Sequence, residues 1–131
     1  MRNRSSVILI KDKHVALIQR IRDGAEYYVF PGGGLEEGET PEQAAAREAW
    51  EELGVTVNIR ECIAEVEYGG TQYFYFADIL EGEFGTGAGE EYSGALRDRG
   101  SYLPVWVEIK RLLALDVRPR EVALRLQIQY P

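Results

Sequence analysis

The sequence predicts an α/β fold in a single domain that covers residues 1–131. Its 131 residues are 45% hydrophobic and 28% charged, which suffices for one compact core but not for two ordinary domains. Short runs rich in β-branched and aliphatic residues recur along the chain, and one segment carries a full set of helix signals. We therefore expect strands and helices that share one core.

The first part of the chain is predicted to form three short strands and a glycine loop. The first two strands flank a polar turn and form a hairpin. Pro31 stops the third strand, and the glycines at 32–34 permit a close approach of the backbone that side chains would forbid. The three strands are Ser5–Ile10, Val15–Arg22 and Tyr27–Phe30.

The clearest helix prediction covers Pro41–Leu53. Thr40 suits the N-cap, Pro41 suits the first helical position, and Gln43 completes a capping box. Gly54 suits the C-terminal cap. Because these signals are local and agree with one another, they predict both ends of the helix.

The rest of the chain is predicted as a strand pair, a long loop, a last strand and two helical segments. Alternation places Tyr73 and Tyr75 on one face of a strand and Phe74 and Phe76 on the other. Leu80–Ser101 is glycine-rich and aperiodic, and so long a loop in a small domain is either functional or disordered. The expected elements are Thr56–Tyr68, Thr71–Ile79, Val105–Val107, Glu108–Leu115 and Pro119–Gln129.

Composition excludes several functional classes. The net charge of -7 disfavours a nucleic-acid polymer as partner. The apolar runs are far shorter than the roughly 20 residues of a membrane span, and the apolar run near the N-terminus is too brief for a signal peptide and is interrupted by Lys11. Cys62 is the single cysteine, so it forms no internal disulfide and no CxxC metal site, and we expect a cytoplasmic protein. The single histidine, His14, argues against a Ser-His-Asp triad or a His-rich zinc site.

Three glutamates on the predicted helix indicate a metal site. Glu48, Glu51 and Glu52 project from one face within a turn, and Arg47 can offset only one of these charges. Carboxylates without histidine or cysteine suit Mg²⁺ or Mn²⁺, and Mg²⁺ binds through a few carboxylates plus substrate phosphates. The alternative is a solvated acidic helix face. The glycine loop at a fixed distance upstream favours the metal site.

The segment Gly33–Val55 resembles the signature of the Nudix hydrolases. The signature positions are met by Gly33, Glu39, Arg47, Glu48, Glu51, Glu52, Gly54 and Val55, and Ala49 replaces the usual larger aliphatic residue. The segments Tyr28–Gly33 and Pro104–Glu108 are also similar to the family. This resemblance implies an α/β/α sandwich with a central mixed β-sheet. It also implies Mg²⁺-dependent or Mn²⁺-dependent cleavage of a pyrophosphate bond in a nucleoside diphosphate linked to another moiety.

The resemblance also assigns roles to residues. Glu48, Glu51 and Glu52 are implied to be catalytic metal ligands, together with the backbone carbonyl of Gly32. Arg47 and Glu39 are implied to support these ligands, with Arg47 orienting Glu51. The general base stays open between Glu48 and one of the two glutamates of the long loop, Glu90 and Glu91.

Substrate recognition is less constrained by the sequence. Tyr28 and Phe74 are candidates for stacking on a nucleobase, although aromatic residues of strands more often serve core or strand packing. Arg20 is a candidate contact for a phosphate or ribose, or else a surface salt bridge. The compact length resembles the MutT-like group, which acts on nucleoside triphosphates. A catalytically silent Nudix domain that binds a nucleotide as a sensor or partner module is the alternative, and both a monomer and a homodimer remain open.

Overall fold

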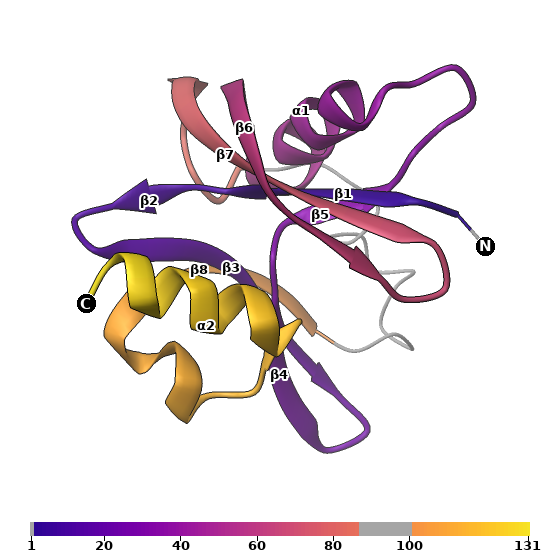
Figure 1. Ribbon diagram of the computed structural model, residues 1–131. Coiled ribbons are helices and arrows are strands. Elements are labelled where there is room, and N and C mark those ends of the chain that lie inside the picture. Colours follow the sequence, from indigo (N-terminus) through magenta and orange to yellow (C-terminus); the bar gives the residue numbers. More distant parts are fainter. Residues whose placement is uncertain (1, 87–100) are drawn as a thin grey trace.

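The computed structural model describes residues 2–86 and 101–131 of the chain (Figure 1). Nine strands, two α-helices and one 3₁₀ helix make up this part of the chain. In chain order they are β1 (Arg4–Ile8), β2 (Ile10–Lys11), β3 (His14–Arg22), β4 (Ala25–Val29), β5 (Gly32–Gly34), α1 (Pro41–Leu53), β6 (Val55–Glu67), β7 (Thr71–Gly82), β8 (Ser101–Glu108), η3 (Ile109–Ala114), β9 (Val117–Arg118) and α2 (Arg120–Gln129).

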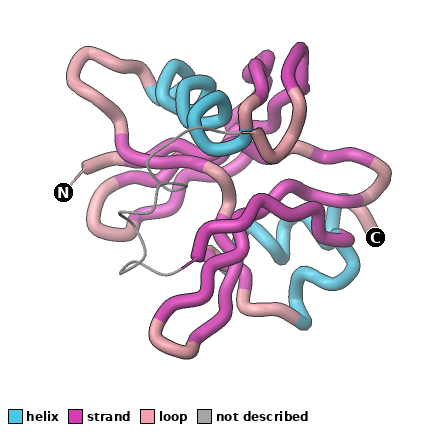
Figure 2. The backbone as a smooth tube through the Cα atoms, turned by 180° about the vertical axis from the view of Figure 1, so that it is seen from behind, coloured by secondary structure: helices cyan, strands magenta, loops and turns pink. Residues whose placement is uncertain are grey.

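The strands form two mixed sheets. One sheet has the order β5-β1-β7-β6, in which β1 runs parallel to β7 and antiparallel to β5. The other has the order β2-β3-β4-β9, with β8 paired to β3. Figure 1 shows α1 over the first sheet and α2 beside the strands of the second, and Figure 2 shows the same separation from behind. The predicted α/β fold is confirmed, with its strands divided between two sheets.

Two hydrophobic clusters hold these layers together, and β1 contributes to both. Val7 of β1 and Leu9, the residue that follows the strand, pack with alanines and Leu53 of α1, whereas Ile8 packs with the aromatic residues of β7 and with α2. Successive side chains of a strand point to opposite faces, so β1 separates the two clusters. The same alternation confirms the predicted faces of β7, because Tyr73 and Tyr75 belong to one cluster and Phe74 and Phe76 to the other.

Helix α1 begins and ends at the predicted residues. Thr40 accepts a hydrogen bond from the N–H of Gln43, the Gln43 side chain accepts one from the N–H of Thr40, and Gly54 adopts the left-handed conformation with φ of 78°. The small face of Ala45 and Ala49, both fully buried, lets the helix lie close to the sheet. This helix therefore places its acidic residues at a fixed position against β1 and β5.

Several predicted boundaries were wrong. The three glycines expected to form a loop are strand β5, because their backbone groups pair with β1 in the register Ser5↔Gly33 and Ser6↔Gly32. Strand β7 continues to Gly82, so the expected loop begins later, and β8 is longer than predicted because it pairs with β3 over its whole length. The expected helix at Glu108–Leu115 is the 3₁₀ helix η3.

In the part of the chain that the structure describes, no helix combines the length and the apolar character needed to cross a membrane.

Candidate active site

The acidic face of α1 lies directly against the glycine strand. Glu48 and Glu52 are 8% and 4% exposed, and the N–H of Gly32 donates a hydrogen bond to Oε1 of Glu52. A Cβ atom built on Gly33 would overlap the carboxylate of Glu48. Glycine at this position therefore leaves the space in which a buried carboxylate approaches the backbone of the strand.

Arg47 connects this acidic face to the loop that precedes the helix. Its side chain is only 23% exposed, and the different nitrogen atoms of its guanidinium contact different partners. The sequence predicted that Arg47 offsets the negative charge of one carboxylate. Its planar guanidinium instead presents several N–H donors in a fixed fork and contacts four carboxylates. The partners are Glu39 at 2.8 and 3.0 Å, Glu51 at 2.9 Å, Glu48 at 3.0 Å and Glu36 at 3.3 Å, together with the carbonyl of Gly34 at 2.9 Å.

These contacts change the acidity of the groups involved. Hydrogen bonds from Arg47 hold the pKa of Glu39 below its ordinary value, and the N–H of Glu36 adds a smaller effect in the same direction. The bonds to Glu39, and next the charge of Glu48, raise the pKa of Arg47 further above its ordinary range. Arg47 and Glu39 therefore stay charged wherever the protein is folded near neutral pH.

The donor set at this site fits a hard divalent cation. The candidate ligands are carboxylate oxygens and a backbone carbonyl, which are the ligands of Mg²⁺ and Mn²⁺, and the bare Gly33 keeps room beside Glu48. Within residues 2–86 and 101–131, no three acidic, histidine or cysteine side chains are already gathered around a common point. Glu48 and Glu51 face Arg47 instead, so ion binding would require at least one of them to turn away from the guanidinium.

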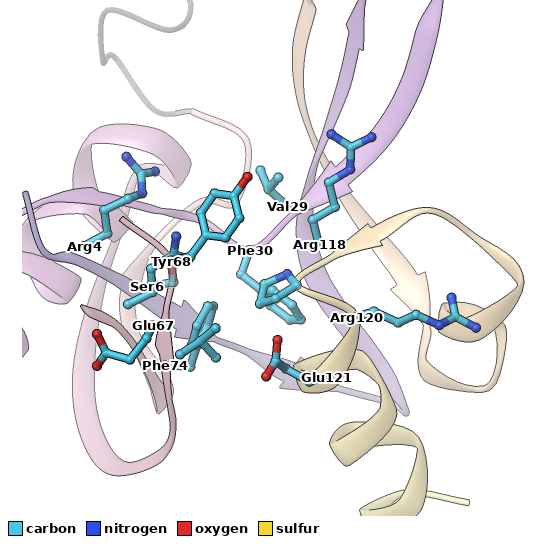
Figure 3. Close-up of a pocket in the computed structure, with 13 residues that line it drawn as sticks. Arg4, Ser6, Val29, Phe30, Glu67, Tyr68, Phe74, Arg118, Arg120 and Glu121 are labelled. Carbon is cyan, nitrogen blue, oxygen red and sulfur yellow. The ribbon is translucent and has the colours of Figure 1, made fainter. Parts of the chain in front are cut away.

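A cavity of about 510 Å³ lies on the opposite face of β1 and β5 (Figure 3). Ser6 lines this cavity, while the neighbouring Ser5 pairs with Gly33 on the side of Glu48. Phe30 and Phe74 meet edge to face inside it, with ring centroids 5.7 Å apart. The lining comes from β1, β4, β6, β7, β9, the start of α2 and the residues next to these elements. It comprises Arg4, Ser6, Val29, Phe30, Val66, Glu67, Tyr68, Gln72, Phe74, Arg118, Pro119, Arg120 and Glu121.

The three predicted substrate contacts lie in different surroundings. Phe74 lines the cavity and is 1% exposed. Tyr28 is half-buried outside the cavity lining, donates its hydroxyl to Glu26 at 3.0 Å, and has its pKa raised by burial and by that carboxylate. Arg20 is 9% exposed, and its guanidinium lies 3.6 Å from the ring centroid of Tyr102. The structure thus brings only Phe74 to the cavity.

Glu90 and Glu91 lie outside the described residues. The sequence reasoning missed Arg4, Tyr68, Arg118 and Glu121, which surround the cavity. They come from distant parts of the chain and follow no spacing pattern. Only the pairing of β1 with β5 and β7, and the return of α2 to the same core, bring them together.

Solved structures share this fold. A NUDIX hydrolase from Nitrosomonas europaea superposes with a TM-score of 0.75 at 19% sequence identity, covering 98% of this chain and 87% of that one. A MutT structure from work on Aliivibrio salmonicida and Vibrio cholerae gives a TM-score of 0.72 at 22% identity, covering 98% of both chains. At such identities the likeness concerns the fold.

Curated proteins match over shorter stretches. An RNA pyrophosphohydrolase of Aliivibrio fischeri (strain MJ11) is 45% identical over 51 residues, which are 39% of this chain and 30% of that protein. The 8-oxo-dGTP diphosphatase of Escherichia coli (strain K12) is 34% identical over 84 residues, which are 59% of this chain and 65% of that protein. The chain therefore spans less than two thirds of the length of either relative.

The family model described as the NUDIX domain matches residues 1–126, which include both sheets, the acidic helix and most of α2. The chain belongs to the NUDIX family.

Proposed function

We propose that this protein is a Mg²⁺-dependent pyrophosphohydrolase that cleaves a nucleoside diphosphate linked to another moiety, with nucleoside triphosphates as the first substrates to test. The observation that carries the proposal is the pair of buried carboxylates, Glu48 and Glu52, held against the glycine strand by α1. Burying two acidic groups is costly unless a positive partner compensates them. Arg47 compensates Glu48 in part, at 3.0 Å, and a divalent cation bound between these carboxylates and the substrate phosphates would add further positive charge.

Each group of the acidic face has a distinct task in this proposal. Glu48, Glu51 and Glu52 would hold the cation together with the carbonyl of Gly32. When bound, Mg²⁺ polarises phosphoryl oxygens and lowers the pKa of a water molecule. Arg47 and Glu39 position the ligands, because the fork of Arg47 holds Glu48 and Glu51 in place until a cation competes for them. Glu48, Glu90 and Glu91 remain the candidates for the general base.

The cavity on the other face of β1 and β5 is the proposed nucleoside site. Its volume of about 510 Å³ falls within the usual range for small-molecule sites. The buried rings of Phe30 and Phe74 form its apolar floor, and the exposed ring of Tyr68 adds flat surface. Arg4 pairs across the sheet with Gly34 of the edge strand. A nucleotide with its base among these rings could therefore extend its phosphates over the edge strand β5 toward Glu48.

The names of the relatives point to two forms of substrate, an RNA and a free nucleotide. One relative is named an RNA pyrophosphohydrolase and another an 8-oxo-dGTP diphosphatase. We propose a free nucleotide rather than a nucleic-acid polymer or a membrane-bound substrate, because the net charge of -7 opposes a polyphosphate backbone. We further propose a single catalytic domain, residues 1–131, that works in the cytoplasm as a monomer or homodimer.

A substrate panel tests this proposal most directly. The purified protein is incubated with Mg²⁺ and nucleoside triphosphates, nucleotide sugars, dinucleoside polyphosphates, ADP-ribose or a 5′-triphosphorylated RNA, and phosphate and pyrophosphate release is measured. We expect turnover of at least one free nucleotide. Turnover of the RNA alone would contradict the choice of substrate. Tight binding of a nucleotide without any turnover would favour the sensor alternative.

The variant Glu52→Gln tests the metal site within the same assay. We expect kcat to fall by about 100-fold or more, because a lost ligand should cost at least as much as a lost supporting residue. The matched control is Glu37→Gln, which removes the same charge from an exposed residue of the preceding loop. Unchanged turnover in Glu52→Gln, with the control also unchanged, would rule out the assignment of Glu52.

A further inference from the structure

The exposed side chain of Arg2, in the segment just before β1, reaches across to strand β5. Its Nε and Nη2 atoms donate hydrogen bonds to the carbonyl of Leu35, at 3.3 and 3.0 Å. The N–H of Leu35 in turn donates to the carbonyl of Asn3 at 3.0 Å, which extends the pairing of β1 with β5 by one residue. The backbone pairing therefore holds Arg2 at a defined position on the edge strand, although its side chain is exposed.

The guanidinium of Arg2 fills the space that a side chain at Gly34 would occupy. A Cβ atom built on Gly34 would lie 2.6 Å from Cζ of Arg2 and 2.7 Å from its Nε and Nη2 atoms. Gly34 pairs with Arg4, and directly opposite residues of an antiparallel pair point to the same face, so this space lies on the cavity side. The carbonyl of Gly34 accepts a hydrogen bond from Arg47 at 2.9 Å. One residue of the edge strand thus contacts a guanidinium on the cavity side and another that belongs to the acidic face.

Arg2 keeps hydrogen-bonding capacity for a ligand. A guanidinium has five N–H donors, and the carbonyl of Leu35 engages only Nε and Nη2. Within residues 2–86 and 101–131, Nη1 of Arg2 has no hydrogen-bond partner. The hydrogen bonds of Arg47 lower the pKa of Glu39 most, and the charge of Arg2 adds a smaller effect in the same direction. A positive group with open donors therefore stands at the edge of β5, close to the acidic loop.

The proposed substrate crosses the β1–β5 pair at this edge. The proposed nucleoside site lies on the cavity side and Glu48 on the other side, and β5 is the outer strand of its sheet. A nucleotide that occupies both sites therefore passes its phosphates over the outer edge of β5. A nucleoside triphosphate carries more negative charge than one divalent cation neutralises, so a second positive group beside the phosphates stabilises the complex.

From this arrangement we infer that Arg2 is a phosphate-binding residue, which places a positive charge where Gly34 has no side chain. The inference rests on the proposed function for the path of the substrate. A planar guanidinium matches two phosphate oxygens at once. Because this contact forms with the bound substrate as well as in the transition state, its loss raises KM and leaves kcat nearly unchanged. In a purely structural role, Arg2 would only hold Leu35 and balance the charge of Glu39.

The variant Arg2→Ala tests this contact with the nucleotide that the substrate panel shows to be turned over fastest. We expect KM to rise about tenfold, the size of one charge-assisted hydrogen bond, with kcat within about twofold of the wild type. The matched control is Arg22→Ala, which removes the same charge from an exposed residue of the β3–β4 hairpin, far from α1 in Figure 1. An unchanged KM in Arg2→Ala, or an equal rise in both variants, overturns the inference.

Moving the charge onto the strand separates a phosphate contact from a structural role. Gly34 is not one of the glycines with a positive φ, so a lysine fits its backbone once the guanidinium of Arg2 is removed. We expect Arg2→Ala/Gly34→Lys to recover most of the wild-type KM without restoring the fork on the carbonyl of Leu35. A double variant that keeps the KM of Arg2→Ala would show that Arg2 acts through Leu35, and would overturn the inference.

Binding of inorganic pyrophosphate, measured by calorimetry with Mg²⁺ present, separates this inference from the proposed function. Binding about tenfold weaker in Arg2→Ala than in the wild type and in Arg22→Ala supports the inference even if no nucleotide is hydrolysed. Equal binding to the three proteins overturns it and leaves the proposed function to the substrate panel.

An EPR titration with Mn²⁺ alone checks that the metal site is intact. We expect the three proteins to bind Mn²⁺ within about twofold of one another, because Arg2 contacts phosphate and no metal ligand. A tenfold loss of Mn²⁺ affinity in Arg2→Ala would show that Arg2 supports the metal site instead, and would overturn the inference. Thermal unfolding of each variant checks that the fold is kept.

Discussion

The two faces of the β1–β5 pair differ in how their charged groups are satisfied. On the face toward α1, Arg47 and its carboxylates form a network inside the protein, with five contacts of 3.3 Å or less to four acidic residues. On the cavity face, Arg118 and Arg120 have protein partners, but the exposed side chains of Arg4 and Glu121 have none among the described residues. A network completed by the protein fixes geometry in advance, whereas exposed groups outside such a network stay available to water or to a ligand.

This difference separates stability from specificity. Substitutions on the α1 face should change the free energy of unfolding, because they leave buried charges without a partner that the fold depends on. Substitutions at the open groups of the cavity face should change which ligand binds and leave the fold largely as it is.

Removing Arg47 should cost the most stability. In Arg47→Ala we expect the free energy of unfolding, measured in urea, to fall by about 3 kcal/mol, because several charge-assisted hydrogen bonds are lost and neighbouring carboxylates then repel each other. Arg47→Lys should recover only part of this loss, because an ammonium group lacks the planar fork.

The matched control for this prediction is Arg60→Ala. Arg60 pairs with Asp78 at 3.0 Å and with Glu61 at 3.4 Å, but its side chain is 41% exposed. Exposed pairs of this kind contribute less than about 1 kcal/mol. Equal losses in the two variants would show that the Arg47 network is no more important than a surface ion pair.

Neighbouring glycines of β5 should separate stability from metal binding. A Cβ at Gly32 would overlap the backbone of Ser5 and come within 2.7 Å of Cα of Ser6, so Gly32→Ala should cost about 2 kcal/mol. The three atoms nearest to a Cβ at Gly33 all belong to the carboxylate of Glu48, which can move. We therefore expect Gly33→Ala to unfold near the wild-type temperature but to bind Mn²⁺ about tenfold more weakly in an EPR titration. Equal thermal destabilisation of both variants would contradict this distinction.

Acid should weaken the network at Glu39. Because the folded-state pKa of Glu39 is lowered, the unfolded chain binds more protons as the pH falls below the ordinary value of 4.5. The stabilisation is therefore complete above that pH and is lost as the pH falls through the folded-state pKa. Urea midpoints measured from about pH 6 to about pH 3 should fall less steeply in Glu39→Gln than in the wild type. Parallel curves would show that Glu39 contributes nothing to acid sensitivity.

The smallest effect is expected at Ser5. Its hydroxyl is fully buried and has no hydrogen-bond partner among the described residues. Removing an unsatisfied polar group costs little, so Ser5→Ala should change the free energy of unfolding by less than about 0.5 kcal/mol or increase it. A loss above about 1 kcal/mol in the same urea measurement would show that this hydroxyl is hydrogen-bonded in solution.

The sequence predicted those parts of the molecule that depend on neighbours along the chain. Helix α1 was confirmed at both ends because Thr40, Gln43 and Gly54 act within one turn of it. The contact of Arg47 with Glu51 follows from helical spacing in the same way. Strand β5 was missed because three glycines carry no strand signal, and only pairing with β1 makes them a strand.

The cavity could not be predicted for a related reason. Phe74 was identified as an aromatic residue, but nothing in its own segment relates it to Phe30, Arg4 or Glu121. These residues meet because β1 lies parallel to β7 and α2 packs against the same cluster. Such contacts join residues far apart in sequence, and no local pattern records them.

Strand β1 contributes residues to both the acidic site and the cavity. Ser5 lies on the acidic side, and Arg4 and Ser6 lie on the cavity side. A slip of this strand by one residue relative to β5 would exchange these faces, burying Arg4 and Ser6 against α1 and turning Ser5 toward the cavity. The two sites would then fail together. Correct pairing of this five-residue strand is therefore a condition shared by the proposed metal site and the proposed nucleoside site.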